Sequence, residues 1–361
     1  MKYLDEFRKS DLLRGQLQRI LEFPFRASFM EVCGTHTMAI SRSGLRSALS
    51  RRVDLVSGPG CPVCVTSQRD MGRAIALAGV EGVILATFGD MMRVPGPQGT
   101  LMEASSRGAD VRVVYSPLDA VALAEENPDR RVVFLGVGFE TTAPAVAGAV
   151  LRAAEKGVHN FYVFSLHKLI PPALQALVNM DDFSIDGFLL PGHVSVILGT
   201  EAYRFLAEEH GIPCVISGFE PADILRAVYL LMRMKEDGKP GVANEYSRAV
   251  RPAGNPKARE TMHRVFEDAD AEWRGLGTIP GSGLRLREEF RTFDAGEWRL
   301  EVPEPEERSG CRCGDVLCGK IRPPECPLFA RACTPDEPFG PCMVSSEGTC
   351  ASYYLYEDHA G

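Results

Sequence analysis

The sequence predicts an α/β protein with two small doubly wound parallel-sheet domains that face one another across a cleft, followed by a C-terminal cysteine-rich domain. Two observations carry this prediction. As far as about residue 236, short β-branched runs alternate with helical patterns, which is typical of βαβ units and parallel sheets. Seven of the eleven cysteines then fall after residue 310, in a segment of different composition.

The elements of the α/β part follow in chain order. Residues 1–24 show a helical pattern of apolar positions that ends at Pro24. Eight apolar runs then predict buried strands at 29–32, 53–56, 83–87, 111–115, 132–136, 161–166, 187–190 and 213–217. Helical patterns lie between most of them, at 36–50, 66–79, 118–126, 141–156, 169–178, 194–210 and 220–236.

Two breaks divide these strands into two sets of four. The Gly- and Pro-rich segment 91–100 replaces the helix between the third and fourth strands, and an Asn-Pro loop precedes the fifth. We therefore predict α/β domains at 25–127 and 128–236, with a closed (β/α)8 barrel as the alternative. The remainder, 237–361, is expected to form a third domain with a helix near 256–273.

Composition and charge disfavour several classes of protein. With 45% hydrophobic and 24% charged residues, the chain is neither disordered nor fibrous. The formal charge of −8, without long runs of like charge, disfavours a nucleic-acid partner or a membrane surface. The first ten residues, MKYLDEFRKS, lack the apolar core of a signal peptide. We therefore expect a cytoplasmic protein whose cysteines are metal ligands or redox thiols more than structural disulfides.

Ligands bind beyond the carboxyl ends of strands in open α/β sheets, and the first strand leads there into Cys33-Gly-Thr-His36. The start of a helix would favour a thiolate at Cys33. A thiolate and an imidazole bind soft transition metals, but these two ligands do not complete a site. Two interpretations stay open: a metal site completed by other ligands, or a buried cysteine beside a capping or core histidine.

The second strand leads into Cys61-Pro-Val-Cys64 at the turn into a helix. This position is typical of redox dithiols, because it lowers the pKa of a thiol and allows a disulfide to open and close. Half of a zinc site has the same spacing, so a redox dithiol, a pair of metal ligands and an inert pair all remain possible.

The second set of strands places fewer chemical groups at its ends. Glu140 follows the fifth strand and is a candidate acid, base or hydrogen-bonding group that faces the cleft. Its segment contains Gly-x-Gly without the third glycine of a dinucleotide fold, so a nicotinamide or flavin site is disfavoured. We expect His167 and His193 to be hydrogen-bonded structural residues, and Cys214 to be part of the core.

The C-terminal region has too few aliphatic residues to hold itself together by packing, so a metal centre is its expected organiser. Four thiolates suit a [4Fe–4S] cluster or a structural zinc, and the redox cysteines elsewhere favour iron and sulfur. The seven cysteines of this region are Cys311, Cys313, Cys318, Cys326, Cys333, Cys342 and Cys350.

Six motifs in order resemble the HypD family of hydrogenase maturation proteins. They are CGTHT at 33–37, GPGCPVCVT at 58–66, GFETTAP at 138–144, GHVSVILG at 192–199, SGFEPADIL at 217–225 and CTPDEPFGPCMVSSEGTCASYY at 333–354. The resemblance implies two α/β domains and an iron–sulfur domain around a cleft. It also implies a scaffold or metallochaperone on which the Fe(CN)2CO unit of [NiFe]-hydrogenases is assembled.

The resemblance further implies roles for single residues. Cys33 would hold the iron together with the N-terminal cysteine of the chaperone HypC, and His36 would lie beside it. Cys61 and Cys64 would form the redox dithiol, and HypE would deliver the cyanide ligands. A [4Fe–4S] cluster would be bound by Cys326, Cys333, Cys342 and Cys350.

On this reading the chain is a redox-active assembly scaffold and not a free-standing enzyme. Two alternatives come from other classes: a stand-alone iron–sulfur disulfide reductase that acts through Cys61 and Cys64, and a zinc-stabilised interaction module without a redox role. The resemblance gives no role to Cys311, Cys313 and Cys318.

Overall fold

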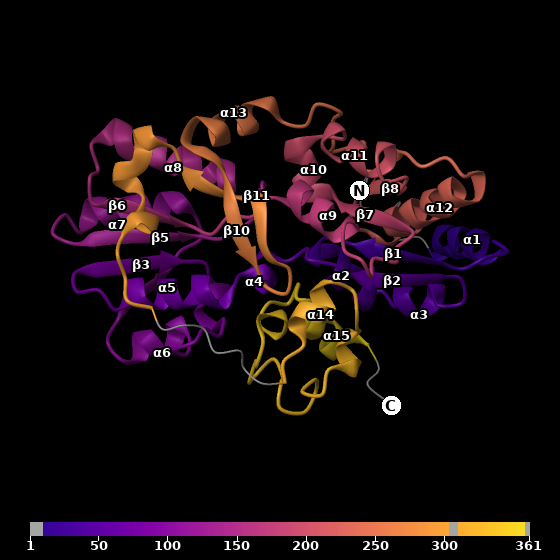
Figure 1. The fold of residues 1–361 in the computed structure, drawn as a ribbon, viewed down its shortest axis with the longest axis horizontal. Helices are drawn as coiled ribbons and strands as arrows, with labels where there is room; N and C mark the ends of the chain where they lie inside the picture. The colour runs from indigo at the N-terminus through magenta and orange to yellow at the C-terminus, as the bar shows by residue number, and fades with distance from the viewer. Residues whose placement is uncertain (1–9, 303–309, 358–361) are drawn as a thin grey trace.

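The computed structural model describes residues 10–302 and 310–357. Its α/β part contains two separate parallel sheets, one in each lobe of the molecule (Figure 1). The first sheet has the order β2-β1-β7-β8-β9, made by Val53–Ser57, Ala27–Glu31, Gly187–Pro191, Cys214–Ser217 and Val242–Asn244. The second has the order β4-β3-β5-β6, made by Asp110–Val113, Val83–Thr87, Arg131–Gly136 and Phe161–Ser165. Two separate sheets exclude a single closed barrel.

Helices cover both faces of each sheet. The first sheet packs α1 (Ser10–Leu21), α2 (Gly34–Arg42), α3 (Leu45–Leu49) and α12 (Pro221–Asp237) on one face, and α9 (Ile170–Val178), α10 (Gly192–Leu198) and α11 (Arg204–Glu208) on the other. The second packs α7 (Pro117–Glu126) and α8 (Ala143–Lys156) against α5 (Gln68–Ala78) and α6 (Leu101–Ser106). Alternate strand residues supply the two cores: Val132 and Phe134 face α8, whereas Val133 and Leu135 face α5.

All eight predicted strands are present, with ends that differ by at most two residues. Most of them are short, buried and covered on both faces, which is why they read as continuous apolar runs. The edge strand β4 is the exception, because its residues are only partly buried. The predicted N-terminal helix is described from Ser10, and its first nine positions lie outside the described residues. None of the described helices is long and apolar enough to span a membrane.

The distribution of strands between the sheets differs from the predicted consecutive sets of four. The chain builds β1 and β2, crosses to build the whole second sheet, and returns to build β7, β8 and β9. Both predicted α/β segments, 25–127 and 128–236, therefore contribute strands to both sheets. Glu31 at the end of β1 pairs with Ser57 of β2 and with Leu189 of β7. Parallel pairing is non-local, so the local pattern locates strands without showing which ones pair.

The connection between β3 and β4, which includes the Gly- and Pro-rich segment 91–100, contains a helix that was not predicted. It holds η2 (Gly89–Arg93) and, directly after that segment, α6, which starts at a capping box formed by Thr100 and Glu103. The further 3₁₀ turns within residues 10–302 and 310–357 are η3 (Glu201–Tyr203), η4 (Glu288–Phe293), η5 (Ala295–Glu297), η6 (Pro323–Glu325) and η7 (Pro341–Met343).

A β-hairpin crosses between the two lobes, where the sequence predicted a helix over 256–273. The helix, α13 (Pro256–Val265), ends early, and the chain continues as β10 (Phe266–Trp273) and β11 (Gly277–Leu286). The prediction was wrong beyond Val265 because the acidic segment 266–273 has the period of a strand, with apolar residues at its buried positions. Figure 1 shows the hairpin descending between the lobes toward the cysteine-rich region.

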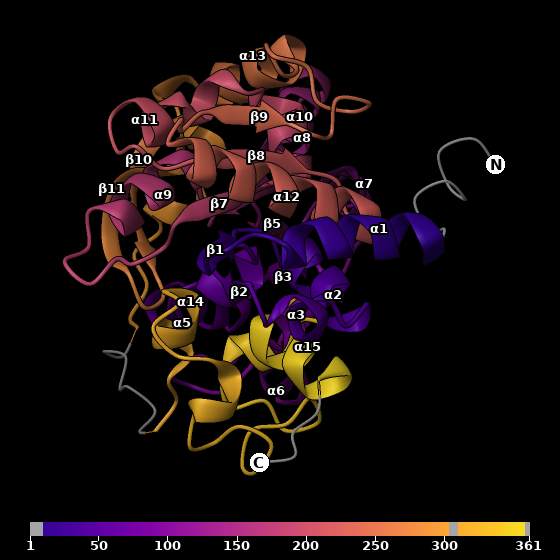
Figure 2. The same cartoon turned by 90° about the vertical axis from the view of Figure 1, so that its right-hand side faces the viewer.

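The C-terminal tail, residues 310–357, packs beneath both lobes, and α15 (Thr349–Tyr356) lies next to α2 and α3 (Figure 2). It contains α14 (Cys313–Leu317) and little other regular structure. Although the tail has few aliphatic residues, it shares a buried cluster with the α/β lobes. Its main apolar contributors are Val316, Leu317, Phe329, Met343 and Tyr353.

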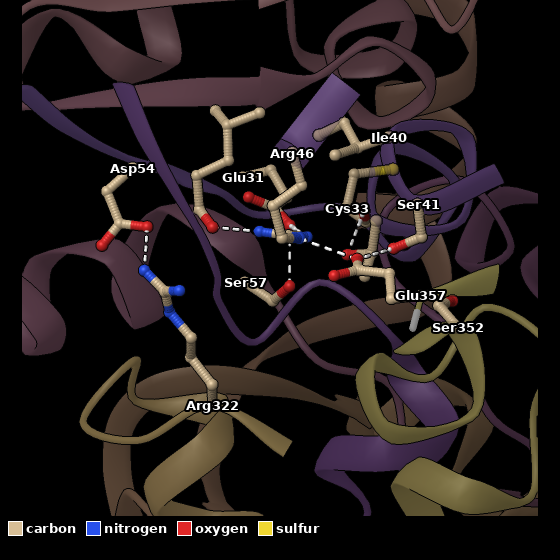
Figure 3. A network of polar contacts seen from close by, with 12 residues as sticks. Glu31, Cys33, Ile40, Ser41, Arg46, Asp54, Ser57, Arg322, Ser352 and Glu357 are labelled. Carbon is tan, nitrogen blue, oxygen red and sulfur yellow. Dashed lines mark hydrogen bonds and ion pairs between the residues drawn. The ribbon is translucent and has the colours of Figure 1, made fainter. Parts of the chain in front are cut away.

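A buried polar network joins the tail to the first sheet (Figure 3). Arg46 lies at its centre, with Nη2 3.1 Å from Glu31 Oε1 and Nε 2.9 Å from Glu357 Oε1. Ser57 Oγ donates to the same Glu31 oxygen at 2.7 Å. Because Glu31 ends β1, the network anchors the tail close to the segment that carries Cys33.

Candidate functional site

A cavity of about 370 Å³ opens where the carboxyl ends of strands from both sheets converge. The loops after β1, β2 and β7 form one side, those after β3 and β5 form the other, and the tail adds Glu347. This is the predicted cleft. A larger hollow of about 760 Å³ lies at the opposite edge of the second sheet and contains none of the candidate residues. The side chains around the cleft that could bind a metal or form hydrogen bonds include Cys33, Thr35, Cys61, Asp90, Thr142, His193 and Glu347.

Two glycines allow the Cys33 loop and the Cys61 loop to lie against each other. The backbone N–H of Gly34 donates to the carbonyl of Gly60 at 2.9 Å. A Cβ atom on Gly60 would stand only 2.1 Å from the backbone nitrogen of Cys33, so a larger residue cannot occupy this position. The close approach places Cys33 and Cys61 on one wall of the cavity.

Burial controls the ionisation of Cys33, which caps the start of α2 and is 7% exposed. Burial raises the pKa of its thiol to about 11. The backbone N–H of His36 lowers this pKa, as predicted for a helix start, whereas the charge of Glu347 raises it. Burial outweighs the helix start, so Cys33 is a thiol at neutral pH. A metal that binds here must displace its proton.

His36 does not line the cavity. Its Nε2 lies 2.9 Å from the carbonyl oxygen of Gly218, at the end of β8, and burial lowers the pKa of the ring to about 4. The rings of His36 and His193 both lie against Phe219, with centroid distances of 4.8 and 4.1 Å. His193, expected to be structural, is the histidine that faces the cavity and solvent.

Glu140 is buried behind the cavity wall that its neighbours Thr141 and Thr142 line. Its Oε1 accepts the backbone N–H of Ile170 at 2.9 Å, at the start of α9. Burial raises the pKa of its carboxyl to about 7, and Oε2 has no hydrogen-bond partner among the described residues. Glu140 thus holds the start of a helix and does not face the cleft as predicted.

Glu347 is a site residue that sequence reasoning missed. Its Oε1 accepts a hydrogen bond from the Thr35 hydroxyl at 2.7 Å, which joins the tail to the Cys33 loop. The two residues are 312 positions apart, so no local pattern indicates the contact. The sequence offered only a weak signal: Glu347 lies between two cysteines of the strongest C-terminal motif.

The two cysteines of the Cys-Pro-Val-Cys motif face in different directions. Cys61 caps α4 (Pro62–Val65) and lines the cavity, and its sulfur accepts the backbone N–H of Cys64 at 3.3 Å. Cys64 is fully buried, and its thiol points to the carbonyl of Pro341 in the tail at 4.0 Å. Burial raises the pKa of Cys64, and thiol hydrogen bonds with Cys342 and Cys61 raise it further. The motif therefore connects the cavity with the tail.

Six of the seven tail cysteines surround a second, small cavity of about 10 Å³. They are Cys311, Cys313, Cys326, Cys333, Cys342 and Cys350. Phe329, Leu328 and Val316 complete its walls, so the thiols lie in apolar surroundings. Nowhere in residues 10–302 and 310–357 do three His, Cys, Asp or Glu side chains gather around one point as a single metal ion requires. By donor chemistry the thiols fit an iron–sulfur cluster, which spaces its four cysteine ligands around a larger core.

The other cysteines lie apart from this cavity. The sulfur of Cys318 donates to the carbonyl of Gly275 at the hairpin tip at 3.5 Å, which gives this unexplained cysteine a structural contact. Cys214 is fully buried in β8, as expected of a core residue. His167 is also buried, with Nδ1 2.9 Å from the Ser165 hydroxyl, and burial lowers the pKa of its ring to about 3.

The model of a protein family described as "HypD: Hydrogenase formation hypA family" matches residues 11–357. The chain belongs to the HypD family. It is 46% identical to the hydrogenase maturation factor HypD2 of Bradyrhizobium diazoefficiens, over 99% of this chain and 97% of that protein. Identity to the hydrogenase maturation factor HypD of Escherichia coli is 44%, over 99% and 98% of the two chains. A putative hydrogenase expression/formation protein of Methanocaldococcus jannaschii is 41% identical over 94% and 95%. The match to the HypD family confirms the resemblance read from the motifs.

Proposed function

We propose that the chain acts in hydrogenase maturation as the scaffold on which the Fe(CN)2CO unit of [NiFe]-hydrogenases is assembled, with HypC and HypE as partners. One observation carries the proposal: Cys33 and Cys61 line the same cavity, and Cys64 connects Cys61 with Cys342, one of the six thiols around the cavity of the tail. A cavity of about 370 Å³ has room for one iron with small ligands, and Cys33 alone leaves the iron open to other donors.

Cys33 would hold the iron as a thiolate. Thiolates are soft ligands that suit an iron made electron-rich by cyanide and carbon monoxide. Its high pKa means that the proton leaves only when the metal binds, so an empty scaffold keeps an unreactive thiol. The N-terminal cysteine of HypC and the diatomic ligands would fill the remaining positions.

Polar side chains of the cavity would orient those ligands. A metal-bound cyanide presents a nitrogen that accepts hydrogen bonds. His193, whose pKa is lowered by partial burial, is neutral at pH 7 and offers one N–H to such a nitrogen. Glu347 accepts the Thr35 hydrogen bond and thereby fixes the loop that carries Cys33.

Cys61 and Cys64 would serve as the redox dithiol. Formation of their disulfide releases two electrons and two protons, and its reduction takes them up again. Cys61 lines the cavity, so this exchange would take place beside the iron. Its exposed fraction of 4% leaves little access for a large disulfide substrate, which disfavours the stand-alone reductase.

The tail would hold a [4Fe–4S] cluster, with Cys326, Cys333, Cys342 and Cys350 as the ligands that the family resemblance implies. Such a cluster, when bound, supplies one-electron chemistry. Phe329, Met343 and Val316 are buried around the thiols and shield Cys333, Cys342 and Cys350 from water, whereas Cys326 is partly exposed.

Infrared spectroscopy of the chain purified with HypC tests the proposal. Metal-bound cyanide and carbon monoxide should give absorption bands in the complex of the unaltered chain. We expect Cys33→Ala to lose these bands, whereas Cys318→Ser, which alters a thiol far from the cavity, should keep them. Bands that persist in Cys33→Ala would show that another residue holds the iron.

A further inference from the structure

Two short segments carry the chain from one lobe to the other on either side of the second sheet. The first, residues 66–67, leads from α4, whose Val65 packs with the core of the first lobe, to α5, whose Met71 packs with that of the second. The second, residues 167–169, leads back from β6 to α9, which begins at Ile170 in the first lobe. The relative position of the lobes therefore depends on how these two crossings are held.

The hairpin β10–β11 holds both crossings, at its place between the lobes in Figure 1. The backbone N–H of Arg274 donates to the carbonyl of Val65 at 2.9 Å, and its Nε donates to the carbonyl of Thr66 at 3.0 Å. At the other strand, the backbone N–H of Leu169 donates to the carbonyl of Ser282 at 2.8 Å. The hairpin thus connects the outward and the returning crossing.

The same hairpin supports the wall of the cavity of about 370 Å³. Trp273, which is 1% exposed, stacks on Phe139 with 6.1 Å between the ring centroids, and Phe139 lines the cavity. The Nε1 of Trp273 donates to Ser282 Oγ at 2.8 Å, next to the contact with the second crossing. A shift of either crossing against the hairpin would therefore move the second-lobe wall of the cavity relative to Cys33.

A buried ion pair joins the two crossings directly. Lys168 lies in the second crossing and is 2% exposed, and its Nζ is 3.1 Å from Oδ2 of Asp70 in the first turn of α5. Compared with an apolar pair, a buried ion pair adds little stability, because desolvation offsets the attraction of the charges. It does hold its two partners in one arrangement, since separation would leave a buried charge unpaired.

We propose that Lys168 is a positioning residue that locks, through Asp70, the angle between the lobes and thereby the width of the cavity around Cys33. Lys168 contacts neither the iron nor its ligands. When the lock is broken, the wall that carries Cys33 and the wall that carries Thr142 separate. The consequence for the iron unit rests on the proposed function, whereas the consequence for the lobes does not.

The separation of the lobes can be measured on the full chain without any metal. Arg152 of α8 and Arg233 of α12 are exposed, one on each lobe, and replacing both with p-acetylphenylalanine allows nitroxide labels to be attached without using a cysteine. Double electron–electron resonance then gives the distribution of distances between the labels. Lys168→Met should make this distribution broader and move it to longer distances. A general loss of stability would lower the urea midpoint of unfolding and leave the distribution in the folded chain unchanged.

The alkylation rate of Cys33, followed in the tryptic peptide 27–42, reports on the cavity itself. In Lys168→Met it should rise by about threefold or more, because access to a buried thiol follows the free energy of local opening. Asp70→Asn, which keeps a hydrogen-bond acceptor, should change both measurements in the same direction by less. Adding Asp70→Asn to Lys168→Met should have little further effect, because the two residues act through one contact.

Lys156→Met is the matched control, because it removes a lysine that pairs with Glu125 within the second lobe. It should leave both measurements as in the unaltered chain.

Three outcomes decide the inference. It is wrong if Lys168→Met keeps the distance distribution of the unaltered chain, and also if the lobes separate while Cys33 is alkylated at an unchanged rate. If Lys168→Met does not fold, Asp70→Asn decides by the same two measurements. If both measurements change as expected but the unaltered complex with HypC lacks the infrared bands of cyanide and carbon monoxide, the lock stands and the proposed function fails.

Discussion

At the scale of single residues, burial dominates the chemistry of the site. Cys33, His36 and Glu140 all lie at positions where sequence reasoning expected reactive groups, and burial shifts the pKa of each toward its neutral form. The sequence indicates which residue types stand at the ends of strands. It does not indicate whether a side chain faces the cavity or the core, because this depends on distant segments such as the one that carries Glu347.

Glu347→Gln should make Cys33 easier to ionise. The charge of Glu347 raises the pKa of Cys33, so its removal should lower that pKa from about 11, by less than about one unit because burial remains. The measurement is the rate of alkylation of Cys33 between pH 7 and 9, followed in the tryptic peptide 27–42, which contains no other cysteine. Glu337→Gln, in the same tail but outside the cavity lining, is the control. An unchanged rate in Glu347→Gln would show that its charge does not act on Cys33.

Glu140→Gln should change how stability depends on pH. In the folded chain the pKa of Glu140 is about 7 against an ordinary value of 4.5, so between these values the folded state keeps a proton that the unfolded state has lost. The carboxyl therefore makes the folded chain progressively less stable as pH rises from 4.5 to 7, by up to about 3 kcal/mol. Glutamine keeps the acceptor for Ile170 without titrating, so this loss should disappear.

Urea unfolding at pH 5 and pH 8 measures the effect of Glu140→Gln. The unfolding free energy at pH 5 minus that at pH 8 is compared between the variant and the unaltered chain. Buried histidines contribute equally to the two proteins, so the remaining difference is the contribution of Glu140. Glu288→Gln, at an exposed position, should behave like the unaltered chain. The same pH dependence in Glu140→Gln would contradict the shifted pKa.

At the scale of elements, prediction succeeds where structure is local. Eight of the nine strands of the two parallel sheets were predicted, most of them because they are buried on both faces and read as apolar runs. The three-residue strand β9 was missed. The hairpin β10–β11 was missed because its first strand follows directly on a helix and alternates acidic residues with the half-buried Ala269 and Ala271. The division of the strands into two consecutive sets of four was also wrong, since the contact of β1 with β7 joins segments separated by the whole second sheet.

Arg46→Met should destabilise the connection between the first sheet and the tail. Burial alone would lower the pKa of Arg46, but Glu31, Tyr353 and Glu357 raise it, so the guanidinium stays charged. Its removal leaves Glu31 unpaired in the core, where an uncompensated charge costs about 3–5 kcal/mol. Urea unfolding should show a loss of this size.

Arg322→Met is the matched comparison for Arg46→Met. Arg322 pairs with Asp54 across the same junction, but it is 53% exposed, so its loss should cost less than about 1 kcal/mol (Figure 3). Equal losses in the two variants would mean that the buried network is not the main anchor of the tail.

At the scale of the whole molecule, the tail is the part that makes the two lobes into one site. It supplies Glu347 to the cavity of about 370 Å³ and Cys342 to the contact with Cys64, and it supports the hairpin tip through Cys318. The sequence motifs predicted that Cys33, the Cys-Pro-Val-Cys pair and the cysteine-rich tail serve one function. They could not predict how the tail contacts the cavity and the hairpin, because each of these contacts joins segments that are far apart in the sequence.

Removal of one tail thiol should therefore affect the site as well as the tail. We expect anaerobically purified chain to contain about four irons and four sulfides, and Cys333→Ser to lose most of both, because a cluster needs four strong ligands. Metal binding contributes to folding of its site, so the variant should also unfold at lower urea concentration. With the tail loosened, the hydrogen bond between Glu347 and Thr35 should weaken, and Cys33 should be alkylated faster.

Cys318→Ser separates these effects from the loss of any tail cysteine. Its sulfur contacts Gly275 and does not line the small cavity, so iron content and the alkylation rate of Cys33 should stay as in the unaltered chain. Full iron content in Cys333→Ser would remove it from the ligand set. If Cys333→Ser loses iron but the alkylation rate of Cys33 does not change, packing and the Arg46 network suffice to hold Glu347 at the cavity. The structure of the cavity would then not depend on the metal in the tail.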